Sequence, residues 1–265
     1  MRLKSALRRG VAAAVIAGIV VSSGIPAYAA PWNIADGDIT VKAGDTEGTN
    51  WVTQGEKEDV KDTDTVITGE SDKNTVTIDT SKGDVDVTFD DLKIDVSGKK
   101  EGDGSGDSPV DAGKAAVTVQ GNGDVTIELD GDNKLKSGSG NAGLEKNKHE
   151  SKGTLTIKDD KGKDGSLTAE GGDDGAGIGG GIGSTGSSIT IRGGAVEAVG
   201  GSNAAGIGDG AGPWSEPDPD TPPSNPNNII ICGDAEVTAK AGRSQMLDAK
   251  APAIGGKYGE VPTEN

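Results

Sequence analysis

The chain repeats a glycine-rich pattern at a fixed separation of 29 residues. Residues 167–179 read Leu-x-Ala-x-Gly-Gly-x-x-x-Ala-Gly-Ile-Gly, and residues 196–208 repeat all of these positions with Val in place of Leu. A looser third copy runs over residues 237–255, and a degenerate earlier copy runs over residues 135–144. Repeats of about 20 to 50 residues that consist of strands and glycine turns are typical of solenoids and propellers.

Short stretches of alternating apolar and polar residues accompany these copies. Alternation with a period of two is the pattern of a half-buried β-strand, and Gly, Asp, Asn and Ser separate the stretches as turns require. In one repeat the alternation directs Ile189 and Val196 inward and Thr190 and Glu197 outward. The expected strands lie within residues 39–41, 76–78, 85–89, 92–96, 117–119, 125–129, 155–157, 167–169, 189–191, 196–198, 229–231 and 237–239.

These repeats predict an all-β chain folded as a parallel β-helix. A propeller blade needs four longer strands and usually carries bulky aromatic landmarks, whereas aromatic residues make up only 2% of this chain. In a β-helix each coil lies about 4.8 Å above the last, so Ile, Val, Leu and Ala stack into a core without aromatic residues. Roughly 235 residues after a leader, at about 29 per coil, predict about eight coils.

The first 29 residues predict a secretory signal peptide. Basic residues precede an apolar run over residues 11–21, and Ala27-Tyr28-Ala29 forms a small-residue cleavage site. The alternative is a membrane anchor, but this run is too short to cross about 30 Å of hydrocarbon as a helix. We therefore expect cleavage after Ala29 and a secreted, extracellular or cell-surface protein whose mature chain has no membrane span.

The mature chain divides into three parts. Residues 30–258 are expected to form the β-helix domain, and residues 259–265 a tail or linker. A proline-rich segment, residues 213–226, is expected to leave the solenoid as an exposed loop. Solenoids need capped ends, and residues 32–66 are the less regular segment that we expect to cap the N-terminal end, with Trp32 and Trp51 covering the core.

The repeat resembles that of a known family. Residues 176–181 and 205–210 carry Ala-Gly-Ile-Gly segments, and residues 189–201 read Ile-Thr-Ile-x-Gly-Gly-x-Val-x-Ala-x-Gly-Gly. Together with residues 125–133, these motifs are similar to those of secreted Gram-positive surface proteins with a carbohydrate-binding domain of the right-handed parallel β-helix type. The resemblance covers most of residues 31–258. It implies non-catalytic binding of an acidic polysaccharide such as pectate, with calcium in the β-helix.

Composition narrows the function classes. A net charge of −17 disfavours nucleic-acid binding, which needs a basic surface. Some β-helices are polysaccharide lyases or hydrolases, and a hydrolase needs paired carboxylates, but the single histidine, His149, lies in no recognisable catalytic motif. We therefore expect a polysaccharide-binding protein that is not an enzyme. A structural or adhesive surface solenoid without a sugar site, and a lyase or hydrolase, remain the alternatives.

Calcium is the expected cofactor, because oxygen donors are abundant in the glycine-rich turns. Asp174 aligns with Asn203 at the 29-residue offset, so stacked corners would place the two about 4.8 Å apart, where they share an ion or form a side-chain ladder. The alternative is that the acids only terminate strands and solvate turns. The candidate metal ligands are Asp90, Asp91, Asp130, Asp132, Asp173, Asp174 and Asn203.

Aromatic rings are the other expected contact with sugar, because a ring face packs on a pyranose ring. Trp214 lies in the proline-rich segment and Tyr258 at the end of the domain. We take these two as the candidate carbohydrate-binding residues. The alternative is that they pack against the prolines and the last coil.

Overall fold

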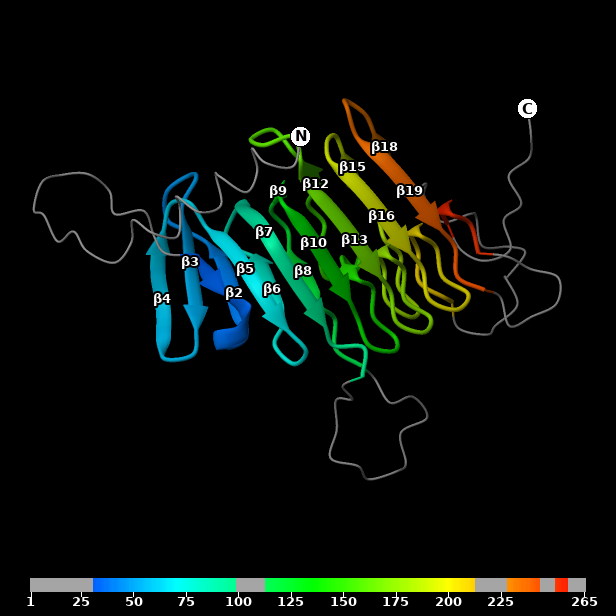
Figure 1. The fold of residues 1–265 in the computed structure, drawn as a ribbon, viewed down its shortest axis with the longest axis horizontal. Coiled ribbons are helices and arrows are strands. Elements are labelled where there is room, and N and C mark those ends of the chain that lie inside the picture. The colour runs from blue at the N-terminus through cyan, green and yellow to red at the C-terminus, as the bar shows by residue number, and fades with distance from the viewer. Residues whose placement is uncertain (1–30, 99–112, 213–227, 244–250, 257–265) are drawn as a thin grey trace, which may run out of the picture.

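The computed structural model describes residues 31–98, 113–212, 228–243 and 251–256. Within these ranges the chain is almost entirely β-strand, and the helical element is one short 3-10 turn, η1 (Ile34–Asp36). Figure 1 shows the strands lying side by side along the long axis, with β4 at one end and β18 and β19 near the other. The signal peptide predicted for residues 1–29, the proline-rich segment 213–226 and the tail 259–265 lie outside the described residues.

The strands are short and succeed one another with little intervening structure. They are β1 (Trp32–Asn33), β2 (Ile39–Ala43), β3 (Asn50–Gln54), β4 (Lys57–Asp62), β5 (Val66–Ser71), β6 (Val76–Thr80), β7 (Val85–Asp95), β8 (Val117–Gly121), β9 (Val125–Asp130), β10 (Asp132–Lys136), β11 (Leu144–Glu145), β12 (Leu155–Lys158), β13 (Ser166–Glu170), β14 (Ile178–Gly179), β15 (Ile189–Ile191), β16 (Ala195–Val199), β17 (Ile207–Gly208), β18 (Ile229–Ile231), β19 (Glu236–Lys240) and β20 (Ile254–Gly255).

The strands form parallel sheets in which each strand pairs with its counterpart from the next pass of the chain. One sheet runs β2-β6-β8-β11-β14-β17-β20. The other has two branches that meet at the long strand β7: β7-β9-β12-β15-β18 and β7-β10-β13-β16-β19. Each pass of the chain therefore adds one strand to the first sheet and one to each branch, an all-β arrangement that is consistent with a β-solenoid.

The sequence repeat corresponds to the strand register. Ser166 lies opposite Ala195 and Ile178 opposite Ile207, both at the predicted 29-residue offset. Other passes differ, from 27 residues between Val117 and Leu144 to 47 residues between Ile207 and Ile254. From Ile39 to Ile254 the described chain places seven successive strands in the first sheet, one fewer than the about eight coils predicted. The count is lower because most passes carry longer loops and the N-terminal residues build a hairpin.

Aliphatic side chains fill the interior, as the alternation predicts. Ile189 and Val196 are buried. Thr190 and Glu197, which follow them in the same strands, are half-buried on the outer surface. The core is a continuous cluster of Ile, Val, Leu and Ala, with Phe89 as its largest fully buried side chain. Burial of apolar area contributes about 25 cal/mol per Å², so this cluster is the main stabilising term of the fold.

An antiparallel hairpin covers the N-terminal end. Strands β3 and β4 extend the first sheet beyond β2 in antiparallel order. The indole Nε1 of Trp32 donates a 2.7 Å hydrogen bond to Asp62 at the end of β4, and the Lys57 ammonium lies 5.3 Å from the centre of the Trp32 ring. Trp32 is buried in the core cluster, which confirms its predicted capping position, whereas Trp51 is only half-buried.

Candidate functional site

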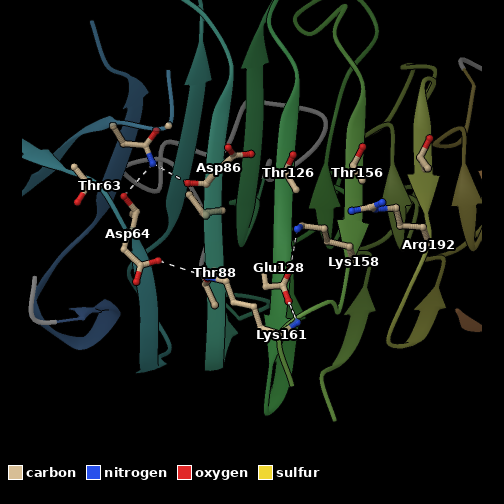
Figure 2. A pocket seen from close by; sticks show the side chains of 15 residues that line it. Thr63, Asp64, Asp86, Thr88, Thr126, Glu128, Thr156, Lys158, Lys161 and Arg192 are labelled. Atoms are coloured by element: carbon tan, nitrogen blue, oxygen red, sulfur yellow. Dashed lines mark hydrogen bonds and ion pairs between the residues drawn. The ribbon is translucent and has the colours of Figure 1, made fainter. Parts of the chain in front are cut away.

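A polar groove of about 580 Å³ lies across the outer face of the branch β7-β9-β12-β15. Figure 2 shows side chains from these four neighbouring strands pointing to the same side. Because the strands belong to successive passes, the groove runs along the stacking direction of the coils. Its lining residues are Gly48, Asn50, Thr63, Asp64, Thr65, Asp86, Val87, Thr88, Thr126, Glu128, Thr156, Lys158, Lys161, Thr190 and Arg192.

A ladder of threonine side chains forms the floor of the groove. Thr126, Thr156 and Thr190 occupy equivalent register positions on β9, β12 and β15, and Asp86 on β7 continues the row. Each is flanked within its strand by buried aliphatic residues, so the alternation turns the hydroxyl outward. Neighbouring hydroxyls are therefore about 4.8 Å apart, the spacing of hydrogen-bonded strands.

A second row runs parallel to the ladder two positions further along the chain, with Thr88 on β7, Glu128 on β9, Lys158 on β12 and Arg192 directly after β15. Lys158 lies opposite Glu128 in the parallel register, and its ammonium Nζ is 3.2 Å from Glu128 Oε2. The same ammonium lies 3.0 Å from Asp160 Oδ2, to which Arg192 Nη2 donates a 2.7 Å hydrogen bond. Figure 2 shows Lys158 and Arg192 next to each other in the groove.

The charged residues of the second row are held in place by backbone groups. Glu128 is buried, and its Oε1 accepts hydrogen bonds from the backbone N–H groups of Asp160 and Lys161 at 2.7 and 2.6 Å. The hydrogen bond with Asp160, supported by Glu128, raises the pKa of Lys158 above its ordinary value. The ammonium therefore stays charged over the neutral pH range and is held between the carboxylates of Glu128 and Asp160.

Residues at the start of β3 and between β4 and β5 form one wall of the groove. The side chain of Asn50 donates to Thr65 Oγ1 at 2.9 Å and to the Asp86 carbonyl at 2.7 Å, which ties this wall to the floor. Across the groove, Lys161 Nζ lies 3.6 Å from Asp64 Oδ1. The lining thus combines three cationic side chains with three carboxylates on a chain whose net charge is −17.

Four of the candidate metal ligands gather at the corner that follows the first branch. Asp90 on β7 lies opposite Asp130 on β9, and Asp91 Oδ1 accepts a 3.0 Å hydrogen bond from the backbone N–H of Asp132. Partial burial, together with the nearby charges of Asp164 and Asp91, raises the pKa of Asp130. The hydrogen bond from the Asp132 N–H to Asp91 stabilises the turn between β9 and β10.

The other three candidate ligands lie at a different corner. Asn203 Nδ2 donates a 3.3 Å hydrogen bond to Asp174 Oδ1, so the predicted stacking of these residues one coil apart is confirmed, in the form of a side-chain ladder. Both residues have left-handed backbone, with φ of 65° at Asp174 and 60° at Asn203. Asp173 beside them is exposed.

The acidic side chains of the described residues do not form a metal-binding group of several carboxylates. Over residues 31–98, 113–212, 228–243 and 251–256 there is no group of three or more His, Cys, Asp and Glu side chains placed to hold a metal ion. The predicted sugar contacts Trp214 and Tyr258 lie outside the described residues.

The groove residues were not among the sites expected from the sequence. Their signal is present, however, in the strand motifs Val-Thr-Ile-Glu, Leu-Thr-Ile-Lys and Ile-Thr-Ile-Arg that begin at Val125, Leu155 and Ile189. Each motif places a threonine and then a charged residue on the outer face. Only the parallel pairing of these segments turns three ordinary exposed strands into one continuous row.

No family model matches the chain, and neither a curated protein nor a solved structure matches it. Among the described residues, no helix has the length and apolar character needed to cross a membrane.

Proposed function

We propose that this protein is a secreted, non-catalytic carbohydrate-binding protein and that its polar groove binds an acidic polysaccharide of the pectate class. The observation that carries the proposal is the groove itself, in which threonine hydroxyls recur on three successive strands and cationic side chains follow on the last two. A polymer that lies along the stack meets a threonine hydroxyl on each of β9, β12 and β15.

The two rows supply the two kinds of contact that such a polymer needs. Threonine hydroxyls both donate and accept hydrogen bonds, as sugar hydroxyls do. Arg192 uses Nη2 toward Asp160, and a guanidinium carries five N–H donors in a planar fork that suits a carboxylate. Lys161 is well exposed at the opposite wall and adds a second positive group. Uronate carboxylates are therefore the expected partners of Lys161 and Arg192.

The remaining parts of the proposal rest on the sequence. The leader pattern over residues 1–29 supports secretion with cleavage after Ala29, and the glycine-rich repeat supports a right-handed parallel β-helix and a likeness to Gram-positive surface proteins. Calcium assistance is kept as one arm of the binding experiment. No binding step is assigned to the ion, because the described residues do not form a carboxylate centre for it.

The decisive experiment is affinity electrophoresis of the purified protein through gels that contain pectate, fully methyl-esterified pectin, xylan or cellulose. Each gel is run with calcium and with chelator. We expect retardation by pectate and little retardation by the esterified polymer, which lacks free carboxylates. We expect the Lys161→Ala/Arg192→Ala variant to bind pectate at least about tenfold more weakly, because two charge-assisted contacts are lost.

A matched variant controls for the loss of two positive charges. Lys93 and Lys134 are similarly exposed lysines paired with Glu70 and Glu170, on β7 beyond the groove and on β10. The Lys93→Ala/Lys134→Ala variant is expected to bind like the unaltered protein. Equal losses in both variants would contradict the groove as the binding site. Unchanged mobility of the folded protein in every gel would favour the structural solenoid, and new unsaturated or reducing ends would favour an enzyme.

A second prediction tests the threonine ladder without changing charge. We expect Thr156→Val to weaken pectate binding about threefold, since one neutral hydrogen bond contributes about 0.5 to 1.5 kcal/mol. Valine keeps the branched shape and suits a strand. Thr168→Val on β13, a half-buried position on the other branch, is the control and is expected to leave the dissociation constant unchanged. Isothermal titration with pectate fragments measures both.

A further inference from the structure

The last coil of the described chain leaves its interior open. Ile231 and Ile254 occupy the inward register positions of Ile191 and Ile207 one pass earlier. The earlier pair is fully buried, whereas Ile231 and Ile254 are 41% and 43% exposed. Strands β18, β19 and β20 are the last strands of their sheets among the described residues, as the C-terminal end of the stack in Figure 1 shows.

The opposite end of the stack is closed to the same kind of contact. There, β4 is the outermost strand of the first sheet, and it carries Lys57, Glu58 and Lys61 as exposed side chains. Exposed charge on an edge strand opposes pairing with another chain. These charges oppose head-to-tail extension of the stack, whereas an association through the open end joins two like ends about a twofold axis.

The backbone of β19 is set for such a pairing. The Glu236 N–H donates to the Gly194 carbonyl at 3.0 Å, and the Lys240 carbonyl accepts from the Gly200 N–H at 2.9 Å. Alternate residues of a strand direct their N–H and C=O groups to opposite neighbours. The N–H and C=O groups of Val237 and Ala239 therefore point toward the open edge.

The side-chain charges on β19 favour one antiparallel register of this strand with its own copy. Antiparallel pairing of β19 with its own copy, centred on Thr238, makes Val237 and Ala239 of the second copy a hydrogen-bonded pair. It also places Glu236 opposite Lys240 of the second copy, and the reverse, on the exposed face of the strand. Opposite charges at directly facing positions stabilise a strand pair. Lys240 already pairs with Glu197 of its own chain, so it would lie between two carboxylates.

We propose that two copies of this protein associate end to end through their last coils, with β19 paired antiparallel to β19 about Thr238. The pairing covers the exposed Ile231 and Ile254 at the open ends and satisfies the edge groups of Val237 and Ala239. Both grooves stay on outer faces in this arrangement, because their strands lie side by side and not at the end of the stack.

Charge exchange on β19 tests the proposal. Sedimentation velocity of the full chain, with reductant present because Cys232 is exposed, is expected to give twice the mass of one chain as concentration rises. Glu236→Lys and Lys240→Glu each place like charges opposite one another at two positions, so each is expected to raise the dissociation constant at least about tenfold. The double variant Glu236→Lys/Lys240→Glu restores both pairs and is expected to restore the dimer.

Two further variants keep the outcome interpretable. Glu70→Lys reverses an exposed charge away from the last coil and is expected to leave the dimer intact. Val237→Pro removes an N–H that faces the open edge and no bond to β16, so it is expected to give a folded monomer. A monomeric unaltered protein at every concentration, or a double variant as weak as the single ones, would overturn the proposal.

Discussion

Replacing Gly179 by alanine is expected to lower the free energy of unfolding by about 3 kcal/mol or more, the range of a severe core defect. Gly179 ends the short strand β14, where its φ of 135° lies in a region that side chains rarely adopt. A Cβ atom at this position would lie 2.1 Å from the carbonyl oxygen of Gly208 on β17. The neighbouring backbone would have to move, and that backbone is stacked on Gly255 in turn.

The prediction concerns close packing of backbones and not glycine content in general. Gly208 repeats the arrangement one pass later, with a φ of 133° and a Cβ that would lie 2.1 Å from the Gly255 carbonyl oxygen. A Cβ added to Gly212, by contrast, meets no atom within 4 Å. Urea unfolding followed by circular dichroism compares Gly179→Ala with Gly212→Ala. Similar midpoints for the two variants would mean that the stack of Gly179, Gly208 and Gly255 tolerates side chains.

The pH dependence of stability is expected to contain a large term from Glu145. This residue is buried on β11, where its Oε2 accepts from the Ala142 N–H at 3.0 Å and its Oε1 from Asn147 Nδ2 at 3.2 Å. Burial raises the pKa of Glu145 from 4.5 to about 7, with a smaller contribution from the charge of Glu150. Two hydrogen bonds therefore do not compensate for the loss of solvent around the charge.

The sign of the effect follows from proton binding. Between about pH 4.5 and 7 the folded chain holds a proton that the unfolded chain has released, so stability falls as pH rises through this window and levels off above it. The full term is about 3 kcal/mol, since one pKa unit corresponds to about 1.4 kcal/mol. Glu145→Gln cannot ionise, so its stability relative to the unaltered protein is expected to increase by about this amount across the window.

Denaturant titrations of both proteins at several pH values measure this difference. The measurements stop just above pH 7, because burial also lowers the pKa of the adjacent Lys146 to about 8 and adds a term of the opposite sign at higher pH. Glu56→Gln, an exposed position in the turn before β4, controls for the loss of one negative charge. A constant stability difference between Glu145→Gln and the unaltered protein at all pH values would show that Glu145 is ionised in the fold.

Local patterns in the sequence were sufficient for the strands, their inward faces and part of their register. Alternation with a period of two assigns Ile189 and Thr190 to opposite faces regardless of what the strand pairs with. The identical spacing of residues 167–179 and 196–208 leaves one way to stack them, which is the observed 29-residue register. These properties depend on neighbouring residues or on repeated ones, so they can be inferred without coordinates.

The number of coils, the closed and open ends and the polar groove depend on contacts between distant segments. Loops of unequal length between passes changed the coil count, because a loop adds residues without adding a strand. The acids chosen as metal ligands stood out in the sequence, yet they divide between two corners. Thr126, Thr156 and Thr190 are each unremarkable alone, and they form one binding surface only because parallel pairing sets them at the same height on adjacent strands.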